Sequence, residues 1–596
     1  MMNTLNRMFQ ESVRKYASMP ALSSKAGGEY KSVTYSEMGA KVRTLASGLV
    51  DLGVQKGDRI ALISENRPEW AVADMAIAHV GAINVAAFPT LPPGQVGYIV
   101  GDSGSKLILV SDKKQLAKAL EVKKVQPDLR IITMDCPADA VNDVITLDDV
   151  MRRGEASPLN DTDYEDLWRS VQPDDWASII YTSGTTGDPK GAILSHYNFA
   201  SNVEAAQDAL TFEPGDVLLS FVPLNHVMGR LVDLYLALGC GATIAYVEDL
   251  RRLRQNMAEV RPHYVTLVPR VFEMFQEGLL RNVAKESDLK QKLFNWALSV
   301  GERRTERIQD RQAVPFLLAF KWRFADTLVF SKIRGRLGLN RLKLFLTGSA
   351  PLPKATAEFF SAMGVTILQG YGLTETSPLV SVSRPAWIKF GTVGPPVIDV
   401  EVKIAADGEI LVRGPNIMQG YYNMPEKTAE VIESDGWFHT GDIGEFDEDG
   451  FLKITDRKKD LLVLANGKKV APQPIENLLK ESPYISQVIL FGDKQSIVTA
   501  LVVPLFERVK AWVKERGISV SSIKDKELAQ LAAVKSLIQE EIERLSGHLA
   551  NFEKVHRFSL IDQEFTVEGG EMTPTLKVKR RVVLEKYRDV IKSMYR

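Results

Sequence analysis

An alternation of short apolar runs with helical patterns constrains the fold more than any other feature of the chain. Apolar runs of strand length are buried strands when turn residues bound them, and a 3.6-residue apolar period indicates a helix. Regular alternation of the two predicts an α/β protein with mainly parallel sheets. The apolar runs occupy residues 59–64, 106–111, 130–134, 264–269 and 342–347, and helical patterns occupy residues 45–52 and 113–123.

The chain is too long for a single hydrophobic core. At 596 residues we expect several domains or subdomains. Short alternating runs between glycines predict a small β-rich subdomain at about 394–455, and a charged run at 456–460 marks a boundary. We therefore predict a large N-terminal domain of layered α/β subdomains over residues 1–455 and a small α+β C-terminal domain over 461–596. A long helical pattern covers residues 527–545 of the latter.

The composition is that of an ordinary globular protein. Hydrophobic residues make up 45%, charged residues 25%, and the net charge is −1, so no overall field attracts nucleic acid or an anionic membrane. The two cysteines, Cys136 and Cys240, indicate a reducing compartment and small buried hydrophobes rather than a disulfide framework. Zinc-binding motifs are lacking.

No segment of the sequence has the pattern of a signal peptide or a membrane span. The first 20 residues lack a continuous apolar stretch. The apolar run at 70–88 is interrupted by Asp74 and His79, and we interpret it as a buried helix running into a strand. We predict a cytoplasmic protein, at most peripheral at the inner face of a membrane.

Residues 276–340 form a basic, helix-rich excursion. Apolar residues interleave with its charges, among them Phe316, Leu317, Leu318, Phe320 and Trp322. One interpretation is a solvated helical segment whose apolar side packs on the core, and the other is an amphipathic surface that faces a membrane. We favour the first, because basic amphipathic patterns are common on ordinary helices.

A glycine- and hydroxyl-rich segment at residues 181–191, YTSGTTGDPKG, follows a strand-like run. Glycines let backbone N–H groups approach an anion, hydroxyls add donors, and Lys190 adds a positive charge. The spacing differs from the Walker loop, because Gly184 and Gly187 are too close together and a glycine follows Lys190. The segment is predicted to bind phosphate, with a plain surface loop as the alternative.

Residues 369–377, QGYGLTETS, combine an aromatic ring, glycines and a carboxylate. Tyr371 could stack on a purine, Thr374 could donate to a phosphate oxygen, and Glu375 could hold Mg²⁺. An ordinary helix cap has the same composition, since T-E-T is common capping chemistry.

Three further segments carry polar side chains with more than one interpretation. Asp442, in GWFHTGD, suits the two hydroxyls of a ribose or the cap of a turn. The basic runs DRKKD at 456–460 and TPTLK at 573–577 suit either a binding site or a solvated face. His226, in PLNHVMGR, is by itself more typical of structure than of catalysis.

Together these motifs resemble the signatures of the adenylate-forming superfamily, which includes acyl-CoA synthetases, peptide-synthetase adenylation domains and firefly luciferase. S-G-T-T-G-x-P-K-G resembles its phosphate loop and Y-G-x-T-E its adenine and Mg²⁺ motif, and the resemblance spans nearly the whole chain. Residues 268–272, 330–333 and 470–476 resemble the long-chain fatty acyl-CoA synthetase branch.

The chain departs from the common family pattern at four positions. Ser349 stands where G-G-A-P-L has its second glycine, and Val463 stands where many members have a second lysine. Asp456 replaces a glycine before Arg457, and Leu576 replaces the glycine of T-G-K. The last two replacements are typical of the long-chain branch.

The resemblance implies a role for each matched residue. The residues implied in ATP binding are Thr182, Ser183, Gly184, Thr185, Thr186, Gly187, Lys190, Gly348, Ser349, Ala350, Gln369, Gly370, Tyr371, Gly372, Thr374, Asp442, Arg457 and Lys577. Those implied in catalysis are Lys577 (or Lys579), His226, Thr374 and Glu375, of which Glu375 also binds Mg²⁺. Lys459 is implied as the hinge, within 456–460, about which a mobile C-terminal domain rotates, and Asn466 and Gly467 lie near the path of CoA.

The implied reaction joins a fatty acid to CoA and converts ATP to AMP and pyrophosphate in two steps, adenylation and then thioester formation. The implied partners are fatty acid, ATP and CoA, without nucleic acid, and a homodimer and peripheral membrane contact are compatible with the resemblance. Three alternatives stay open: a fatty acyl-AMP ligase that loads a carrier protein, a ligase for an aryl or amino acid, and a non-catalytic acyl-binding protein.

Overall fold

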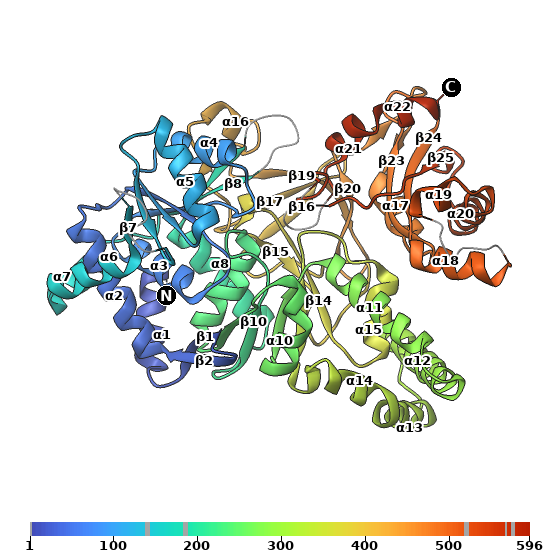
Figure 1. Cartoon of the computed structure of the whole chain (residues 1–596), viewed down its shortest axis with the longest axis horizontal. Coiled ribbons are helices and arrows are strands. Elements are labelled where there is room, and N and C mark those ends of the chain that lie inside the picture. Colours follow the sequence, from blue (N-terminus) through green and yellow to red (C-terminus); the bar gives the residue numbers. More distant parts are fainter. Residues whose placement is uncertain are drawn as a thin grey trace. The chain divides into compact units, whose positions relative to one another are not determined.

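The computed structural model describes residues 3–136, 144–182, 189–517, 524–566, 569–573 and 578–595. The chain divides into two compact units, whose elements are labelled in Figure 1. Unit 1 comprises Met1–Leu352, Thr356–Val402 and Leu411–His439, and unit 2 comprises Pro353–Ala355, Lys403–Ile410 and Thr440–Arg596. The mixed α/β class is confirmed, while the domain boundary and hinge at 456–460 stay predictions.

Two eight-stranded sheets form unit 1. In the order β15-β14-β13-β12-β10-β11-β1-β2, the six inner strands are parallel and both edge strands are antiparallel. In the order β18-β9-β8-β4-β3-β5-β6-β7, the six strands from β8 to β7 are parallel to one another. Strand β9 pairs antiparallel with β8 on one side and with β18 on the other. The predicted parallel sheets are therefore confirmed.

The strands of the first sheet are β1 (Pro20–Ala26), β2 (Glu29–Thr34), β10 (Val217–Ser220), β11 (Thr243–Tyr246), β12 (Tyr264–Leu267), β13 (Leu344–Thr347), β14 (Ile367–Gly372) and β15 (Leu379–Val382). Those of the second are β3 (Arg59–Ile63), β4 (Ile83–Ala86), β5 (Leu107–Val110), β6 (Arg130–Thr133), β7 (Val144–Thr146), β8 (Trp176–Thr182), β9 (Lys190–Ser195) and β18 (Gly420–Tyr421).

Parallel strands need long crossovers, and helices supply them. The helices up to residue 429 are α1 (Leu5–Lys15), α2 (Tyr35–Asp51), α3 (Pro68–His79), α4 (Pro93–Ser103), α5 (Lys113–Val125), α6 (Leu147–Ala156), α7 (Asp161–Arg169), α8 (His196–Ala209), α9 (Ala237–Gly239), α10 (Leu253–Val260), α11 (Pro269–Ala284), α12 (Asp288–Gln309), α13 (Phe316–Ala325), α14 (Ser331–Arg336), α15 (Lys354–Ala362) and α16 (Pro425–Ala429), with wider π-type turns at Gly229–Leu236 and Asp326–Phe330.

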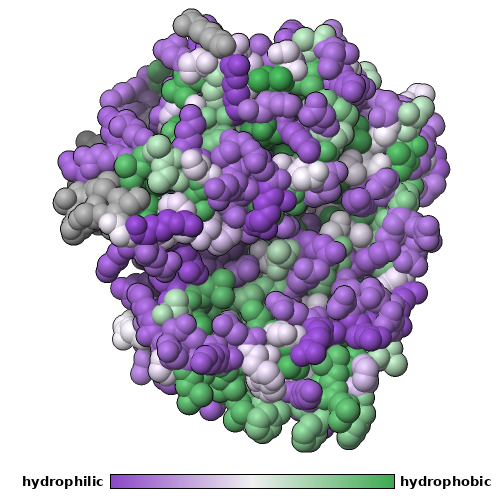
Figure 2. Space-filling model, turned by 90° about the vertical axis from the view of Figure 1, so that its right-hand side faces the viewer, coloured by the Kyte–Doolittle hydropathy of each residue, from purple (hydrophilic) through white to green (hydrophobic). Residues whose placement is uncertain are grey.

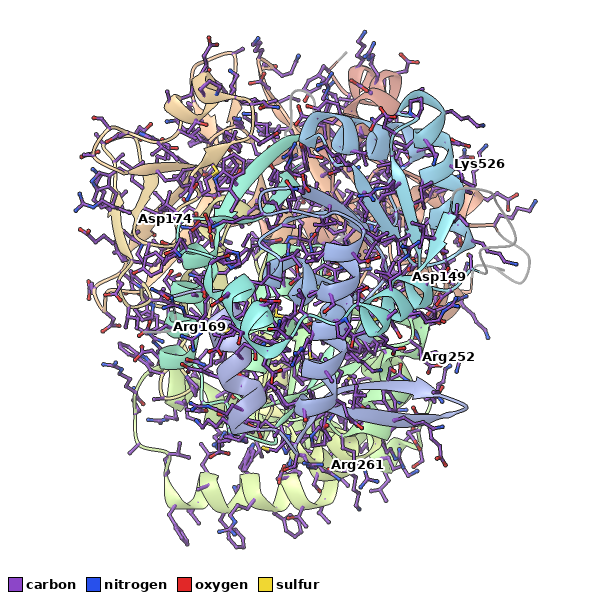
Figure 3. All side chains as sticks on the ribbon, turned by 90° about the vertical axis from the view of Figure 1, so that its left-hand side faces the viewer. Asp149, Arg169, Asp174, Arg252, Arg261 and Lys526 are labelled. Carbon is purple, nitrogen blue, oxygen red and sulfur yellow. The ribbon has the colours of Figure 1, made fainter. Side chains whose placement is uncertain are left out.

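Local side-chain caps fix where several helices begin. In α6, the Thr146 hydroxyl accepts from the Asp149 N–H at 3.0 Å, and Asp149, labelled in Figure 3, accepts from the Thr146 N–H at 3.1 Å. This reciprocal capping box satisfies two backbone donors that a helix start otherwise leaves free. Thr34 with Glu37 and Ser195 with Asn198 begin α2 and α8 in the same way.

The polar interruptions of the apolar run at 70–88 are satisfied inside the protein. Every residue of α3 from Trp70 to His79 is buried, and β4 follows. Asp74 forms an ion pair with Arg230, and His79 Nδ1 lies 2.6 Å from the Met75 carbonyl oxygen. A buried helix running into a strand is therefore confirmed.

Helix α13 corrects the interpretation of the basic excursion. Trp322 Nε1 donates to the Ala362 carbonyl oxygen at 3.1 Å, so this side of the helix faces the core. Phe316, Leu317 and Phe320 are 82%, 70% and 63% exposed. The expectation that the apolar residues pack on the core is wrong for these three, because α13 is apolar around most of its circumference and only one side can face inward.

Unit 2 has its own sheets and core. A four-stranded sheet, most of which belongs to unit 2, has the order β16-β17-β19-β20, and a pair β21-β22 follows. A three-stranded sheet β23-β24-β25 packs with α17 and α20 around Val488, Leu490, Val502 and Ile538. The elements are β16 (Glu401–Ile404), β17 (Glu409–Arg413), β19 (Phe438–Phe446), β20 (Leu452–Arg457), β21 (Leu462–Val463), β22 (Lys469–Val470), α17 (Pro472–Leu479), β23 (Ile485–Phe491), β24 (Val498–Pro504), α18 (Phe506–Glu515), α19 (Asp525–Gln530), α20 (Ala532–Leu545), β25 (Val555–Leu560), α21 (Arg580–Lys586) and α22 (Arg588–Ser593).

The single helix expected over residues 527–545 is two helices. Leu531 is extended (φ −65°, ψ 127°) and separates α19 from α20. Leu528 and Val534 are both fully buried. Six residues of continuous helix would place these side chains about 120° apart around the helix axis, and the break lets both enter one core cluster.

Both cysteines are free thiols, Cys136 buried and Cys240 partly buried. Within the described ranges, no helix combines the length and the apolar character that a membrane crossing requires.

Candidate active site

The predicted phosphate loop connects two antiparallel strands. β8 and β9 pair from Trp176 with Ser195 to Thr182 with Lys190, so Lys190 stands at the mouth of the hairpin. A Cβ on Gly191 would lie 2.7 Å from Ile179 Cγ2, so a side chain there has no room. Ser183, Gly184, Thr185, Thr186 and Gly187 lie outside the described residues.

Tyr421 brings Lys190 and Glu375 together. The Lys190 ammonium lies 4.8 Å from the centre of the Tyr421 ring, and the Tyr421 hydroxyl donates to Glu375 Oε1 at 2.8 Å. Burial, and next the charge of Glu375, raise the pKa of Tyr421 above its ordinary value, so the hydroxyl stays a donor. The sequence analysis missed Tyr421, since the only local signal was a Gly-Tyr pair 46 residues from Glu375.

Backbone hydrogen bonds hold both members of this contact in place. β18, which carries Tyr421, pairs with β9, which begins at Lys190. The Met418 N–H, just before β18, donates to the Glu375 carbonyl oxygen at 2.9 Å. Thr374 and Glu375 are half-buried in the short 3₁₀ turn Thr374–Thr376. The segment at 418–421 therefore fixes the turn and the lysine relative to one another.

The carboxyl ends of β13 and β14 lie side by side. Thr347 pairs with Gln369, so Gly348, Ser349 and Ala350 leave the sheet beside Gly370 and Tyr371. Ligands of open parallel sheets bind at such carboxyl ends. A Cβ on Gly348 would lie 3.0 Å from Met228 Sδ and 3.2 Å from the Gly370 carbonyl oxygen. Gly372 is as tightly enclosed, since its Cβ would overlap the Pro378 carbonyl oxygen.

His226 lies next to these strand ends. The Met228 N–H donates to His226 Nδ1 at 3.1 Å, which puts the proton of the neutral ring on Nε2. Burial lowers the pKa of His226 to about 4, so the ring is neutral at pH 7. Met228 also contacts Ser349, with Oγ to Sδ at 3.7 Å. The structure thus brings the PLNHVMGR segment and the GSAPL segment together.

A buried ionic network supports the helix that follows His226. Arg230 pairs with Asp74 and donates from Nη1 to Ser178 Oγ at 2.7 Å, and the Tyr235 hydroxyl donates to Asp74 at 2.8 Å. Arg230, Asp74 and Tyr235 are all at most 2% exposed. Removing one partner of such a group leaves an uncompensated buried charge, so the network fixes this helix strongly.

In unit 2, Asp442 and Arg457 form an ion pair across a hairpin. They are register partners on β19 and β20, and Arg457 Nε donates to Asp442 Oδ1 at 2.8 Å. Asp442 is 3% exposed. The two residues that the motifs assigned to one ligand group are therefore adjacent.

The other predicted residues of unit 2 lie on turns. Lys459 is exposed after β20, and Asn466 and Gly467 form the exposed turn between β21 and β22, where Gly467 has φ 78°. Lys577 lies outside the described residues. Lys579 precedes α21, and its N–H donates to the Glu571 carbonyl oxygen at 2.7 Å.

The donor set around Glu375 fits a magnesium ion that is held mainly by its substrate. In the part of the chain that the structure describes, no three His, Cys, Asp or Glu side chains cluster as a metal cage. Mg²⁺ typically takes one or two carboxylates, substrate phosphates and water. The half-buried carboxylate of Glu375, which shares the contact with Tyr421 with Lys190, is compatible with that requirement.

Comparison with known proteins finds matches to AMP-binding enzymes along nearly the whole chain. Residues 9–422 match the AMP-binding enzyme family, and residues 459–596 match the C-terminal domain of AMP-binding enzymes. The long-chain-fatty-acid–CoA ligase FadD15 of Mycobacterium bovis is 35% identical over 95% of this chain and 93% of that protein. The long-chain-fatty-acid–CoA ligase ACSBG2 of Xenopus laevis is 31% identical over 99% of this chain and 84% of its own length.

Solved structures share the fold. The adenylation domain of a carboxylate reductase from Mycobacterium chelonae has a TM-score of 0.76 at 24% identity, over 99% of this chain and 91% of that one. The O-succinylbenzoate–CoA synthetase of Bacillus subtilis, in complex with AMP, has a TM-score of 0.67 at 20% identity, over 96% and 97%. The chain therefore belongs to the AMP-binding enzyme family, the adenylate-forming superfamily, and within it to the branch of the long-chain acyl-CoA synthetases.

Proposed function

We propose that this protein is an AMP-forming long-chain fatty acid–CoA ligase. It activates a fatty acid with ATP, releases pyrophosphate, and transfers the acyl group from the acyl adenylate to CoA. The observation that carries the proposal is the meeting of Lys190 and Glu375 at Tyr421, beside the carboxyl ends of β13 and β14. The near-full-length relatives, which are named long-chain-fatty-acid–CoA ligases, supply the substrate class.

Attack of a carboxylate on the α-phosphate brings two anions together, so positive charge must offset their repulsion. Lys190 and the loop at 182–187 bind the β- and γ-phosphates, and Thr374 donates to a phosphate oxygen. Glu375 holds Mg²⁺, which neutralises phosphate charge when bound. Neutral His226 has a proton on Nε2 and lies next to the strand ends, which suits it to orient the fatty acid carboxylate.

The residues that match the nucleotide motifs of the family bind the nucleoside. Gly348, Ser349, Ala350, Gln369, Gly370 and Gly372 enclose the adenine, and Tyr371 stacks on it. Asp442 accepts from the ribose hydroxyls, and Arg457 fixes the carboxylate of Asp442 and contacts the ribose. Lys577 bridges the fatty acid carboxylate and the α-phosphate in the first step.

The second step needs a site that admits a thiol after it has favoured a highly charged transition state. Rotation of residues 461–596 about Lys459 withdraws Lys577 and opens a path for CoA near Asn466 and Gly467. The proposal includes that the protein forms a homodimer and contacts a membrane peripherally.

The test is acyl-CoA formation from ATP, CoA and acids from acetate to oleate. We expect the highest kcat/KM for the long chains, because each buried CH₂ contributes about 0.8 kcal/mol of binding. Activity confined to short or medium chains, or to aryl acids, would overturn the long-chain assignment. If pyrophosphate release does not depend on CoA and the acyl group is transferred to a carrier protein, the protein is an acyl-AMP ligase.

ATP–pyrophosphate exchange identifies the catalytic lysine. We expect Lys577→Ala to reduce exchange by roughly 10²–10³-fold, the usual loss for one transition-state charge contact, and Lys579→Ala to retain it. If Lys579→Ala loses exchange and Lys577→Ala retains it, Lys579 is the catalytic lysine. If both variants keep full exchange activity, neither lysine is catalytic.

A further inference from the structure

The outward side of α13 presents an apolar arc that is bordered by positive charge. Successive helix residues are about 100° apart, so Phe316, Phe320 and Phe324 lie within about 80° of one another, with Leu317 next to them. Their side chains are 82%, 63%, 54% and 70% exposed, respectively. Lys321 and Arg323 are exposed and fall on opposite borders of the arc. Arg323 is about 20° beyond Phe316, and Lys321 is about 40° beyond Leu317.

A second stripe on α12 extends this arc. Leu289, Leu293 and Trp296 recur at helical spacing and are 77%, 36% and 37% exposed. The rings of Trp296 and Phe324 meet edge to face, with their centres 6.3 Å apart. The two stripes therefore form one surface, which we name the α12–α13 face, with Phe316, Leu317, Phe320, Phe324, Leu289, Leu293 and Trp296 as its apolar residues. Figure 2 shows hydrophobic residues gathered at the lower edge of the view, the end of unit 1 where Figure 1 places these helices.

The charge of the surrounding segment is strongly positive. Residues 316–336 contain five basic residues and one acidic residue, a net charge of +4, although the whole chain has a net charge of −1. The acidic residue, Asp326, is paired with Arg334 at 2.7 Å. Lys321, Arg323, Lys332 and Arg336 are all exposed. The positive charge is therefore concentrated where the apolar surface is exposed.

We propose that the α12–α13 face docks on the surface of an anionic phospholipid bilayer. Aromatic and leucine side chains on one side of a helix, with basic residues at the borders, are the pattern of helices that lie in the membrane interface. The long stems of Lys321 and Arg323 let their charges reach lipid phosphates while the phenylalanine rings enter the acyl boundary. The proposal deepens the proposed function, since long-chain fatty acids partition into bilayers and the docked enzyme would meet them there.

The bilayer is favoured over a protein partner by the arrangement of charge. Protein interfaces have few charged residues at their centre and no fixed sign at their rim, whereas both borders of this arc carry the same sign. A second copy of this chain would place the two +4 segments against each other, which is unfavourable.

The test is flotation of the full-length protein with vesicles of phosphatidylglycerol and phosphatidylcholine, compared with vesicles of phosphatidylcholine alone. We expect binding to the anionic vesicles that weakens with salt. The triple variant Phe316→Ser/Phe320→Ser/Phe324→Ser should lose at least tenfold in partition coefficient. Lys321→Gln/Arg323→Gln should lose about fivefold for each charge, and only on anionic vesicles.

Val125→Ser is the matched control, because Val125 is 76% exposed on α5 and lies outside the face. All substituted residues are exposed, so unchanged melting temperatures are expected. Equal flotation of wild type and triple variant, or equal binding to both vesicle types, would overturn the proposal. Concentration-dependent self-association that the triple variant abolishes, without vesicle binding, would assign the face to a second copy instead. Flotation needs no catalysis, so a failure of the proposed ligase activity is seen separately, in acyl-CoA formation.

Discussion

The two ionic groupings of the candidate site are built in opposite ways. In unit 2, Asp442 and Arg457 are 15 residues apart and meet because β19 and β20 form one hairpin. In unit 1, three distant segments supply Lys190, Glu375 and Tyr421. They meet because β18, which carries Tyr421, pairs with β9, which begins at Lys190, and because the Tyr421 side chain contacts both Lys190 and Glu375. A local hairpin fixes the first pair, whereas the second grouping depends on the packing of the whole unit. Substitutions in each grouping test these two kinds of dependence separately.

The largest effect is expected from Glu375→Gln, which removes the carboxylate charge at the distant grouping and keeps its shape. ATP–pyrophosphate exchange should fall roughly 10²–10³-fold, because the protein's ligand for Mg²⁺ is lost. The requirement for Mg²⁺, measured as the concentration that gives half-maximal exchange, should rise. Glu426→Gln, on the exposed surface of α16, is the control. An unchanged Mg²⁺ response would remove Glu375 from metal binding.

Asp456 makes the hairpin of unit 2 sensitive to pH. It pairs in register with Ile443, next to Asp442, and burial raises its pKa to about 7. Its Oδ1 accepts from the Arg457 N–H at 2.6 Å, while Oδ2 has no hydrogen-bond partner in the described ranges. A carboxyl with a raised pKa in the folded state stabilises fully below its unfolded pKa near 4, and this stability is lost as pH rises through 7.

Asp456→Asn cannot ionise, so its free energy of unfolding relative to wild type should rise between pH 4 and 7 by up to about 4 kcal/mol. Urea unfolding of unit 2 at several pH values measures this difference. Asp449→Asn, on the exposed turn between β19 and β20, is the control. A constant difference across this pH range would show that Asp456 has the same pKa in the folded and unfolded states.

A double-mutant cycle measures the hairpin pair itself. Asp442→Asn and Arg457→Gln should be coupled by about 1–3 kcal/mol in nucleotide binding, because one partner is buried and the hydrogen bond is charge-assisted. The same cycle on Lys453 and Glu445, an exposed pair on the same hairpin at 3.1 Å, should give at most about 0.5 kcal/mol. Equal coupling in both cycles would contradict a binding role for Asp442 and Arg457.

The smallest effect is expected from Tyr421→Phe, which deletes only the hydroxyl that donates to Glu375 and keeps the ring beside Lys190. Losing one hydrogen bond of about 1 kcal/mol should raise the KM for MgATP three- to tenfold, with the KM for fatty acid and the melting temperature unchanged. Its neighbour Tyr422, whose ring packs against Trp176, gives the control Tyr422→Phe. A general loss of activity together with stability would make Tyr421 merely structural.

Pattern reasoning predicted the elements whose signals are local. The apolar runs at 59–64 and 106–111 are the strands β3 and β5, and the helix expected at 113–123 is α5. Pattern reasoning failed where the continuity of a helix competed with the burial of its side chains. The continuous period at 527–545 hid the break at Leu531, because burial of Leu528 and Val534 in one core outweighed helix continuity.

Among the site residues, adjacency was predictable only between runs that lie close together in the sequence. Asp442 and Arg457 lie on two runs that pair as a hairpin. By contrast, nothing local connects His226 to Ser349, which meet through Met228. The same limit applied to α13, since periodicity shows that a helix has an apolar side but not whether that side meets a core.

The sequence by itself determined which chemical groups the candidate site contains: a glycine- and hydroxyl-rich segment with Lys190, a carboxylate at Glu375 and a second one at Asp442, on an alternating α/β frame. These depend on residue type and short spacing, which the chain carries locally. Only the tertiary structure decided that Tyr421 joins Lys190 to Glu375, and that the phenylalanines of α13 face outward. Both outcomes depend on which distant segments share a sheet or cover a helix, and no short stretch of sequence contains that information.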